Sequence, residues 1–256
     1  MRLKQSPKRT KKEISLLGAV HIGNAVFFVY KNFDGNIKLR MGNEEKIQEK
    51  LLRRMIELNP RIKKIMNSYK LKPAVNAKTL NELSGGHMND TCKVAIGIYS
   101  FLPETIRKTV NFESIKEASM LHDMGKALIP SKILNKPAKL NRKERKIMNI
   151  HSTLGYELLK TQSIKSETLG LIKFHHQNLQ HSGYPLITES QNVSDLGVQI
   201  VSVADKYSAL RERRVYRRKL SRAESLLILY KEVLEGKIKR EIYNALFKYA
   251  ETCDNQ

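Results

Sequence analysis

The sequence is poor in cysteine, with only Cys92 and Cys253 among its 256 residues. The two are far apart, so their spacing forms no metal-binding pair, and two cysteines do not make a disulfide framework. The sequence therefore does not belong to the small domains that disulfides stabilise. A reducing cytosol is the simplest setting, and we expect a cytoplasmic protein.

Acidic residues are also scarce: 25 Asp and Glu stand against 47 Lys and Arg, a formal net charge of +22. Such a field favours anionic partners, which include nucleotides, nucleic acid and acidic membrane surfaces. A lysine-rich proteome would produce the same excess, so the charge identifies no partner by itself. We expect no nucleic-acid partner, because no basic motif interleaved with aromatic residues accompanies the charge.

A hydrophobic run long enough to span a membrane is absent. The longest candidate, "ISLLGAVHIGNAVFFVY" (residues 14–30), has no charged residue, but it carries His21 and Asn24 near its middle. A spanning helix needs roughly 20 predominantly apolar residues, and no small-residue cleavage site follows the run. Its second half continues through the turn-forming Asp34-Gly35 into "NIKLRM". This pattern predicts a β-hairpin, and a membrane anchor is the less favoured alternative.

After the hairpin the pattern becomes helical. One apolar rhythm comes from Ile47, Leu51, Leu52, Met55, Ile56 and Leu58, and it is broken near Pro60. From about residue 80 no strands alternate with helices, so a parallel α/β sheet is excluded. We expect a mainly α protein: an all-helical bundle over residues 81–256, behind an N-terminal extension over residues 1–80. The extension combines a basic tail, the hairpin and a helix, and a regulatory role for it is left open.

Two helix starts in the bundle have a capping-box pattern. Asn141 is followed by Glu144, and Ser221 is followed by Glu224, with Gly236 as the stop signal of the second helix. An apolar stripe follows the first of these starts, formed by Ile147, Ile150, Leu154 and Leu158. His151 lies beside that stripe, so we expect its ring to point into the core or along its edge.

The adjacent pair His122-Asp123 carries the first sign of chemistry. It follows the apolar helical segment "FESIKEASML", and neighbouring positions on a helix point about 100° apart. The carboxylate could then bridge two metal ions while the histidine binds one. A buried carboxylate is unfavourable unless it is paired or coordinated, and a metal provides that compensation.

Further candidate ligands lie in apolar helical surroundings: His87, His151, His175, His176 and Asp205. A nitrogen-rich site with bridging carboxylates suits two close divalent transition metals such as Fe, Mn or Zn better than Mg or Ca. Any one of these histidines taken alone is more often a satisfied core residue, and we leave His21 and His181 under that interpretation. The joint arrangement is much more specific than its members.

Four segments carry a family resemblance: "HDMGKALIPSKILNKPAKLNRKE", "HSTLGYELL", "HHQNLQHSGYP" and "ADKYSALRERRVYRRKLS". Their order and spacing over residues 84–235 resemble the HD-GYP subfamily of HD-domain phosphohydrolases, bacterial enzymes that hydrolyse cyclic di-GMP. The resemblance implies an all-helical HD domain and a phosphodiesterase that forms pGpG, with GMP as the product of a second cut. It also implies a dinuclear metal site, in which we favour Fe or Mn.

The site residues follow from the same resemblance. The implied metal ligands are His87, His122, Asp123, His151, His175, His176 and Asp205, with Asp123 bridging and also catalytic. Lys126 matches the motif lysine and is implied both in catalysis and in phosphate binding. The implied substrate contacts are completed by Gly183, Tyr184 and Pro185 of the name-giving turn and by Arg214 and Arg217.

Several positions depart from the family pattern. Gln177 replaces a glutamate, Gln180-His181 replaces an Asp-Gly pair, Ser208 replaces an aspartate and Val215 replaces a proline. Leu83 stands where members with a third metal have glutamate, so we expect two metals. The departures leave open a degenerate receptor that binds a cyclic dinucleotide or a partner protein without cutting. The scaffold also permits another phosphoester substrate, such as a hybrid cyclic dinucleotide or a nucleotide. A homodimer or a signalling-protein partner is likewise left open.

Overall fold

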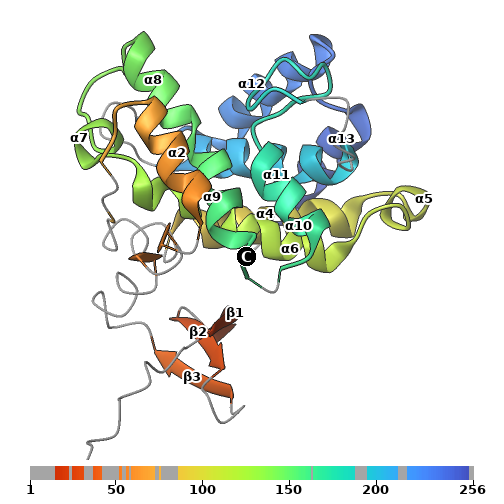
Figure 1. Ribbon diagram of the computed structural model, residues 1–256. Coiled ribbons are helices and arrows are strands. Elements are labelled where there is room, and N and C mark those ends of the chain that lie inside the picture. The colour runs from red at the N-terminus through yellow and green to blue at the C-terminus, as the bar shows by residue number, and fades with distance from the viewer. Residues whose placement is uncertain are drawn as a thin grey trace, which may run out of the picture. The chain divides into compact units, whose positions relative to one another are not determined.

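The computed structural model in Figure 1 describes the backbone of residues 15–22, 25–31 and 37–41 in the N-terminal part. Further along it describes residues 52–53, 56–57, 59–72, 75, 86–162, 164–187, 195–212 and 218–253. The chain divides into two compact units, Met1–Asn43 and Glu44–Gln256.

The first unit contains a three-stranded antiparallel sheet in the order β1-β2-β3. The strands are β1 (Ser15–Ile22), β2 (Ala25–Lys31) and β3 (Ile37–Met41). Strands β2 and β3 pair from Lys31 opposite Ile37 to Phe27 opposite Met41, which confirms the predicted hairpin. The segment weighed as a membrane anchor forms β1 and β2 instead. No helix in the described part of the chain is both long enough and apolar enough to span a bilayer.

The second unit is helical, and its described residues contain no strand, as predicted. Its elements are α2 (Pro60–Ser68), α4 (His87–Phe101), α5 (Glu104–Arg107), α6 (Phe112–Leu121), the 3₁₀ helix η1 (Met124–Leu128), α7 (Ser131–Leu134), α8 (Arg142–Asn149), α9 (His151–Leu159), α10 (Ser166–Phe174), α11 (Asp195–Arg211), α12 (Arg222–Leu234) and α13 (Arg240–Thr252).

Helix α4 is the central element of this unit. It packs against α6, α11 and α13, while α10 packs on α6 and α9, and η1 lies against α9. The core side chains at these contacts are aliphatic and almost completely buried, among them Ile98, Leu154, Ile172 and Val201. The helices that carry the candidate ligands are therefore mutual neighbours around one core.

The predicted capping boxes are both present. Asn141 Oδ1 accepts the Glu144 amide at 2.9 Å while Glu144 Oε2 accepts the Asn141 amide at 2.8 Å, and Ser221 and Glu224 repeat the exchange at α12. Gly236 follows α12 with a φ of 71°, the left-handed conformation that suits glycine. The segment after Asn141 is not one helix, however. It breaks at Ile150, whose amide bonds to the Ile147 carbonyl at 3.3 Å, so His151 begins a new helix.

Pro60 begins a helix rather than only ending one, because a proline at the first helical position loses no hydrogen bond. Asn59 caps α2, and its side-chain amide also donates to Glu157 of α9, at 2.7 Å to the carbonyl and 2.9 Å to the carboxylate. Leu52 and Ile56 are helical and buried, whereas the other four members of the apolar rhythm lie outside the described residues. The domain boundary at residue 80 stays a prediction.

Candidate metal centre

The structure brings all seven predicted ligands into one cluster, mostly through helix ends. His87 is the first residue of α4 and His151 the first of α9, while Asp205 lies within α11. The others follow the last turns of two helices: His122 and Asp123 come after α6, and His175 and His176 come after α10. All except His176 are buried, and His176 is half-buried.

One local hydrogen bond orients three of the histidines. The Nδ1 atoms of His122, His151 and His175 lie 2.9, 2.8 and 2.7 Å from the carbonyl oxygens of Ser119, Met148 and Ile172. A carbonyl only accepts, so each Nδ1 carries the proton and donates it. In the neutral ring the Nε2 atom then has a free lone pair, which is the form in which histidine binds a metal.

The Nε2 atoms of three histidines converge closely. His151 Nε2 lies 3.3 Å from His175 Nε2 and 3.1 Å from His176 Nε2. Two unprotonated nitrogens at that distance repel each other unless a proton or a metal ion lies between them. In addition, His122 Nε2 and Asp123 Oδ1 are buried and have no hydrogen-bond partner among the described residues. The donor set therefore fits bound metal ions.

The possible ligand atoms form three overlapping groups, each within 4.8 Å: His151, His175 and His176; His87, His122 and Asp205; and His122, Asp123 and His175. The first two groups share no member. Asp123 lies between them, with Oδ1 3.3 Å from His151 Nε2 and Oδ2 3.4 Å from His122 Nε2. This is the arrangement that a bridging carboxylate between two ions would need.

The pKa shifts in the cluster agree with a site for positively charged ions. Burial alone would raise the pKa of Asp123, but the charges of Lys126 and His122 hold it well below its usual range. Burial, with the neighbouring His122 and His151, lowers the pKa of His175 to about 3. Burial also disfavours the charged form of His122, yet Asp123 and Asp205 outweigh it and raise the pKa of His122 to about 10. Two carboxylates with lowered pKa in a buried cluster mark a place where positive charge is stabilised.

Lys126 faces the same carboxylate. Its Nζ lies 2.5 Å from Asp123 Oδ2, and η1 carries both the lysine and the close contact to α9. Gly125 makes this contact possible, because a Cβ there would lie 1.9 Å from the His151 carbonyl oxygen. The sequence suggested Lys126 as a phosphate contact, and the structure shows in addition that it pairs with Asp123.

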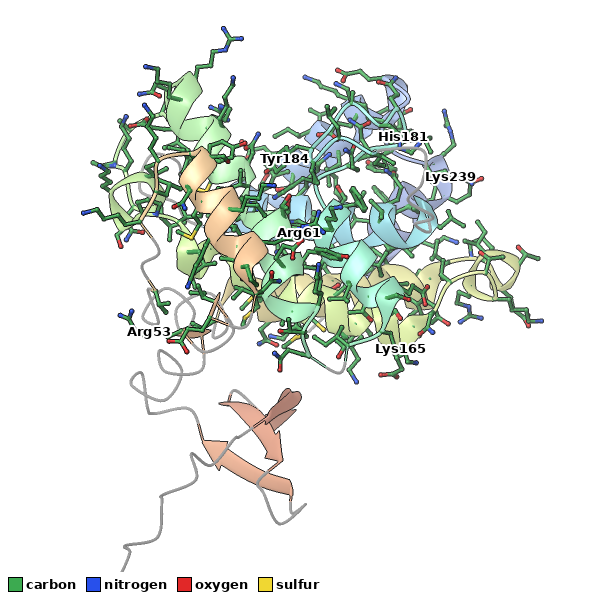
Figure 2. All side chains as sticks on the ribbon, viewed as in Figure 1. Arg53, Arg61, Lys165, His181, Tyr184 and Lys239 are labelled. Atoms are coloured by element: carbon green, nitrogen blue, oxygen red, sulfur yellow. The ribbon has the colours of Figure 1, made fainter. Side chains whose placement is uncertain are left out.

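The Gly-Tyr-Pro turn lies directly against the cluster. The Tyr184 ring centroid is 4.6 Å from that of His176 and 6.3 Å from that of His151. A Cβ on Gly183 would lie 2.1 Å from the His176 carbonyl oxygen, so only glycine permits this approach. His181 is exposed and belongs to none of the possible ligand groups. Figure 2 shows it away from Tyr184, toward Lys239.

Two predicted residues lie outside the described part of the chain, and one neighbour of the cluster was not predicted. Arg214 and Arg217 lie outside the described residues. Ser208 is buried one turn beyond Asp205. Glu212, whose Oε2 lies 3.7 Å from His87 Nδ1, was missed. Its position seven residues after Asp205, directly after the end of α11, was the available signal.

A family model described as HD domain matches residues 102–242, more than half of the chain. The chain belongs to the HD domain family. The matched region contains six of the seven clustered residues, all except His87, and it also contains the Gly-Tyr-Pro turn. The predicted resemblance to HD-GYP phosphohydrolases is confirmed at the level of family, since curated relatives of this HD domain are cyclic dinucleotide phosphodiesterases.

Two such relatives are named for different cyclic dinucleotide substrates. A cyclic di-GMP phosphodiesterase response regulator of Xanthomonas campestris is 39% identical over 120 residues, 45% of this chain and 31% of that protein. A 3'3'-cGAMP-specific phosphodiesterase of Vibrio cholerae is 33% identical over 132 residues, 50% of this chain and 30% of that protein. The chain thus matches about a third of the length of each relative.

A solved structure shares the fold. It is described as an HDG"Y"P protein from Bdellovibrio bacteriovorus, and it covers 80% of this chain and 64% of its own with a TM-score of 0.51. Sequence identity is 16%, so the comparison supports the helical architecture alone.

Proposed function

We propose that this HD domain is a metal-dependent phosphodiesterase that hydrolyses cyclic di-GMP to pGpG, with GMP as the product of a second cut. The observation that carries the proposal is the convergence of five imidazoles and two carboxylates in one buried cluster, with Nε2 atoms 3.1–3.3 Å apart. The named activities of the two relatives support the substrate class, and both substrates are cyclic dinucleotides.

The seven clustered residues would hold two divalent transition metal ions, Fe or Mn, with Asp123 shared between them. When bound, such ions polarise a phosphoryl oxygen and lower the pKa of a water molecule, which supplies hydroxide near neutral pH. The protein contributes the fixed geometry. Three rings are held by backbone carbonyls, and the Asp123 carboxylate is held by Lys126.

Lys126 has a second task in this proposal. An ammonium group has three N–H donors, and Asp123 Oδ2 accepts one of them. The remaining donors can hydrogen-bond to a phosphoryl oxygen and offset the negative charge that develops there during attack. Lys126 is partly accessible to solvent, as a residue that touches substrate must be.

Tyr184 provides an aromatic surface at the edge of the cluster. The Tyr184 side chain is half-buried, and its ring is tilted 35° to the ring of His176. This contact fixes the position of Tyr184 relative to His176, one of the proposed metal ligands. Stacking of a nucleobase on an aromatic side chain contributes about 1–3 kcal/mol. We propose that one guanine stacks here, and that Arg214 and Arg217 bind the second phosphate.

The test combines metal analysis with a hydrolysis assay. Protein loaded with Fe(II) or Mn(II) is expected to hold two ions per chain and to convert cyclic di-GMP to pGpG. Chromatography of the reaction mixture measures this conversion. Asp123→Asn, which keeps the size of the side chain, is expected to lose metal and at least ~10³-fold of the rate, because it removes the shared anion. Protein that holds two ions and cuts neither cyclic di-GMP nor 3'3'-cGAMP would contradict the proposal.

The second candidate function is a receptor that binds the dinucleotide without cutting, and the substitutions at Gln177, Gln180-His181 and Ser208 favour it. Equal affinity for cyclic di-GMP in the wild type and in Asp123→Ala, with no turnover by either, would establish the receptor. Faster turnover of 3'3'-cGAMP than of cyclic di-GMP in parallel assays would instead keep the enzyme and change its substrate.

A further inference from the structure

Gln177 follows the two histidines of the cluster, and its side chain is almost completely enclosed, with 1% of the residue exposed. Both ends of its amide are used. The Oε1 atom accepts the Gly183 amide at 3.0 Å, and the Nε2 group donates to the Pro185 carbonyl. Gln177 thus makes one hydrogen bond on each side of Tyr184.

An amide satisfies both of these backbone groups, whereas a carboxylate ion does not. The turn offers one donor, Gly183 N–H, and one acceptor, the Pro185 carbonyl, so the side chain must accept on one atom and donate on the other. An ionised glutamate at this position would place an oxygen against the Pro185 carbonyl oxygen. Gln177 itself is almost fully buried, and a buried polar group that loses its partner is unfavourable.

The two bonds matter because the rest of the loop is attached elsewhere. Gln180 Nε2 donates to the Glu235 carbonyl at 2.7 Å, and the Leu179 amide donates to the Lys237 carbonyl at 3.0 Å. These contacts tie residues 179–180 to the segment after α12. Among hydrogen bonds that join described residues, those made by Gln177 are the ones that reach residues 183–185.

The turn held in this way carries the ring that faces the metal centre. Gly183 lies directly against the His176 carbonyl, and the Tyr184 ring lies 4.6 Å from the His176 ring. A shift of Gly183 or Pro185 would therefore move the Tyr184 ring relative to a metal ligand. Figure 2 shows Tyr184 next to the helices of the cluster.

We propose that Gln177 is a positioning residue for Tyr184, and that this chain needs an amide here where a carboxylate would misplace the turn. The departure from the family pattern is then part of a working site rather than a sign of degeneration. The expected effect on dinucleotide binding rests on the proposed function, whereas the effect on the turn does not.

Two variants separate the roles of the amide. Gln177→Glu keeps the acceptor and the size but loses the donor, and Gln177→Met keeps the approximate size without either hydrogen bond or charge. The matched control is Gln199→Glu, which places a carboxylate at another buried glutamine, one whose Oε1 accepts the Lys239 amide at 3.4 Å. The control is expected to leave the turn and the dinucleotide affinity unchanged.

The first measurement is hydrogen–deuterium exchange of the metal-loaded protein. Loss of one net hydrogen bond corresponds to about a tenfold change in an opening equilibrium. Exchange of the Gly183 amide, measured in the peptide that covers residues 183–187, is therefore expected to rise about tenfold in both Gln177 variants, with metal content equal to that of the wild type. If the Glu variant does not fold, the Met variant, which buries no charge, decides the question.

The second measurement is the response to cyclic di-GMP. Both Gln177 variants are expected to raise KM about tenfold and to change kcat less than about threefold, because stacking on Tyr184 would be weakened while the metal ligands stay in place. Unchanged exchange over residues 183–187 in both folded variants would overturn the proposal. A wild type that cuts no cyclic dinucleotide would reject the proposed function, and the exchange result would still test Gln177.

Discussion

At the scale of single residues, the centre depends on which atom of each side chain already has a partner. His122, His151 and His175 are oriented by a carbonyl three residues earlier, so their ligating nitrogens are free. His87 is the first residue of its helix, and among the described residues its Nδ1 has no carbonyl to which it donates a hydrogen bond. Its Nε2 contacts Asp205 at 2.8 Å, while its Nδ1 faces Glu212 at 3.7 Å.

Ser208 gives a residue-scale prediction. Its hydroxyl is buried and has no hydrogen-bond partner in the described part of the chain. Ser208→Ala is therefore expected to stabilise the protein by about 1 kcal/mol, because an unsatisfied buried polar group is removed. Chemical denaturation measures the change in the free energy of unfolding.

The control for this experiment is Ser225→Ala. Ser225 is equally buried, but its hydroxyl donates to the Ser221 carbonyl at 2.9 Å. The control is expected to lose about 1 kcal/mol. A loss of stability or of metal in Ser208→Ala would show that the hydroxyl has a partner after all.

At the scale of elements, the site depends on two close contacts made by α9. Its first turn lies against η1, where Gly125 and Gly155 allow the backbones to approach, and this brings Asp123 to His151. Its last turn carries the buried Glu157, which holds α2 through Asn59. One helix therefore links the metal centre to a segment 98 positions earlier in the sequence.

The glycine contact predicts a strong effect of one added methyl group. In Gly125→Ala the new Cβ would lie 1.9 Å from the His151 carbonyl oxygen and 2.5 Å from the Gly155 nitrogen, so η1 must move away from α9. We expect a destabilisation of about 1–3 kcal/mol and weaker metal binding, measured by unfolding and by metal titration. Gly155→Ala is the control, because its closest contact would be 3.2 Å and a small shift relieves it. Equal effects of the two substitutions would contradict this account.

The cap of α2 predicts a larger effect than an ordinary helix cap. Asn59→Ala removes the bond to the Arg61 amide and both bonds to Glu157, which leaves a buried carboxylate with fewer partners. The expected destabilisation is about 2–4 kcal/mol, the sum of a cap and a bond to a charged group. Asn111→Ala at α6 is the comparison, since Asn111 caps only the Ser114 amide at 3.1 Å and should lose about 1 kcal/mol. Thermal or chemical unfolding of the two variants distinguishes them.

At the scale of the whole molecule, the net charge of +22 is concentrated in part on α7, α8 and their connection. The one carboxylate there, Glu144, is bound by Lys136 at 2.7 Å. Figure 2 shows long nitrogen-tipped side chains projecting outward from these helices. The exposed cations of this basic arm are Lys132, Lys139, Arg142, Lys143, Arg145 and Lys146. Its field extends toward the site, since the charge of Arg145 acts on Tyr184, whose pKa is raised mainly by burial.

The basic arm predicts salt-dependent capture of an anionic dinucleotide. Between about 20 and 200 mM salt, kcat/KM is expected to fall several-fold while kcat stays constant, because screening acts on encounter. Replacing four arm cations with serine should flatten this dependence: Lys139, Arg142, Lys143 and Lys146. The matched control replaces four other exposed cations, Lys63, Lys64, Arg240 and Lys248, and an equally large effect there would show that only net charge matters.

The sequence by itself determined the features that depend on neighbours within about four residues. The capping boxes, the helix over "FESIKEASML" and the paired strands all follow from local hydrogen bonding and apolar periodicity. The motif order also identified the family. These features can be predicted from the sequence because the residues that produce them are close along the chain.

Only the tertiary structure decided which atoms meet. His87 and Asp205 are 118 positions apart and lie at 2.8 Å, which packing of α4 on α11 produces and no local pattern contains. The break at Ile150, the pairing of Lys126 with Asp123 and the two bonds of Gln177 were likewise beyond local reasoning. In the sequence Gln177 was only a departure from the glutamate of the family pattern. Its proposed positioning role depends on a donor and an acceptor that the folded turn places on either side of Tyr184.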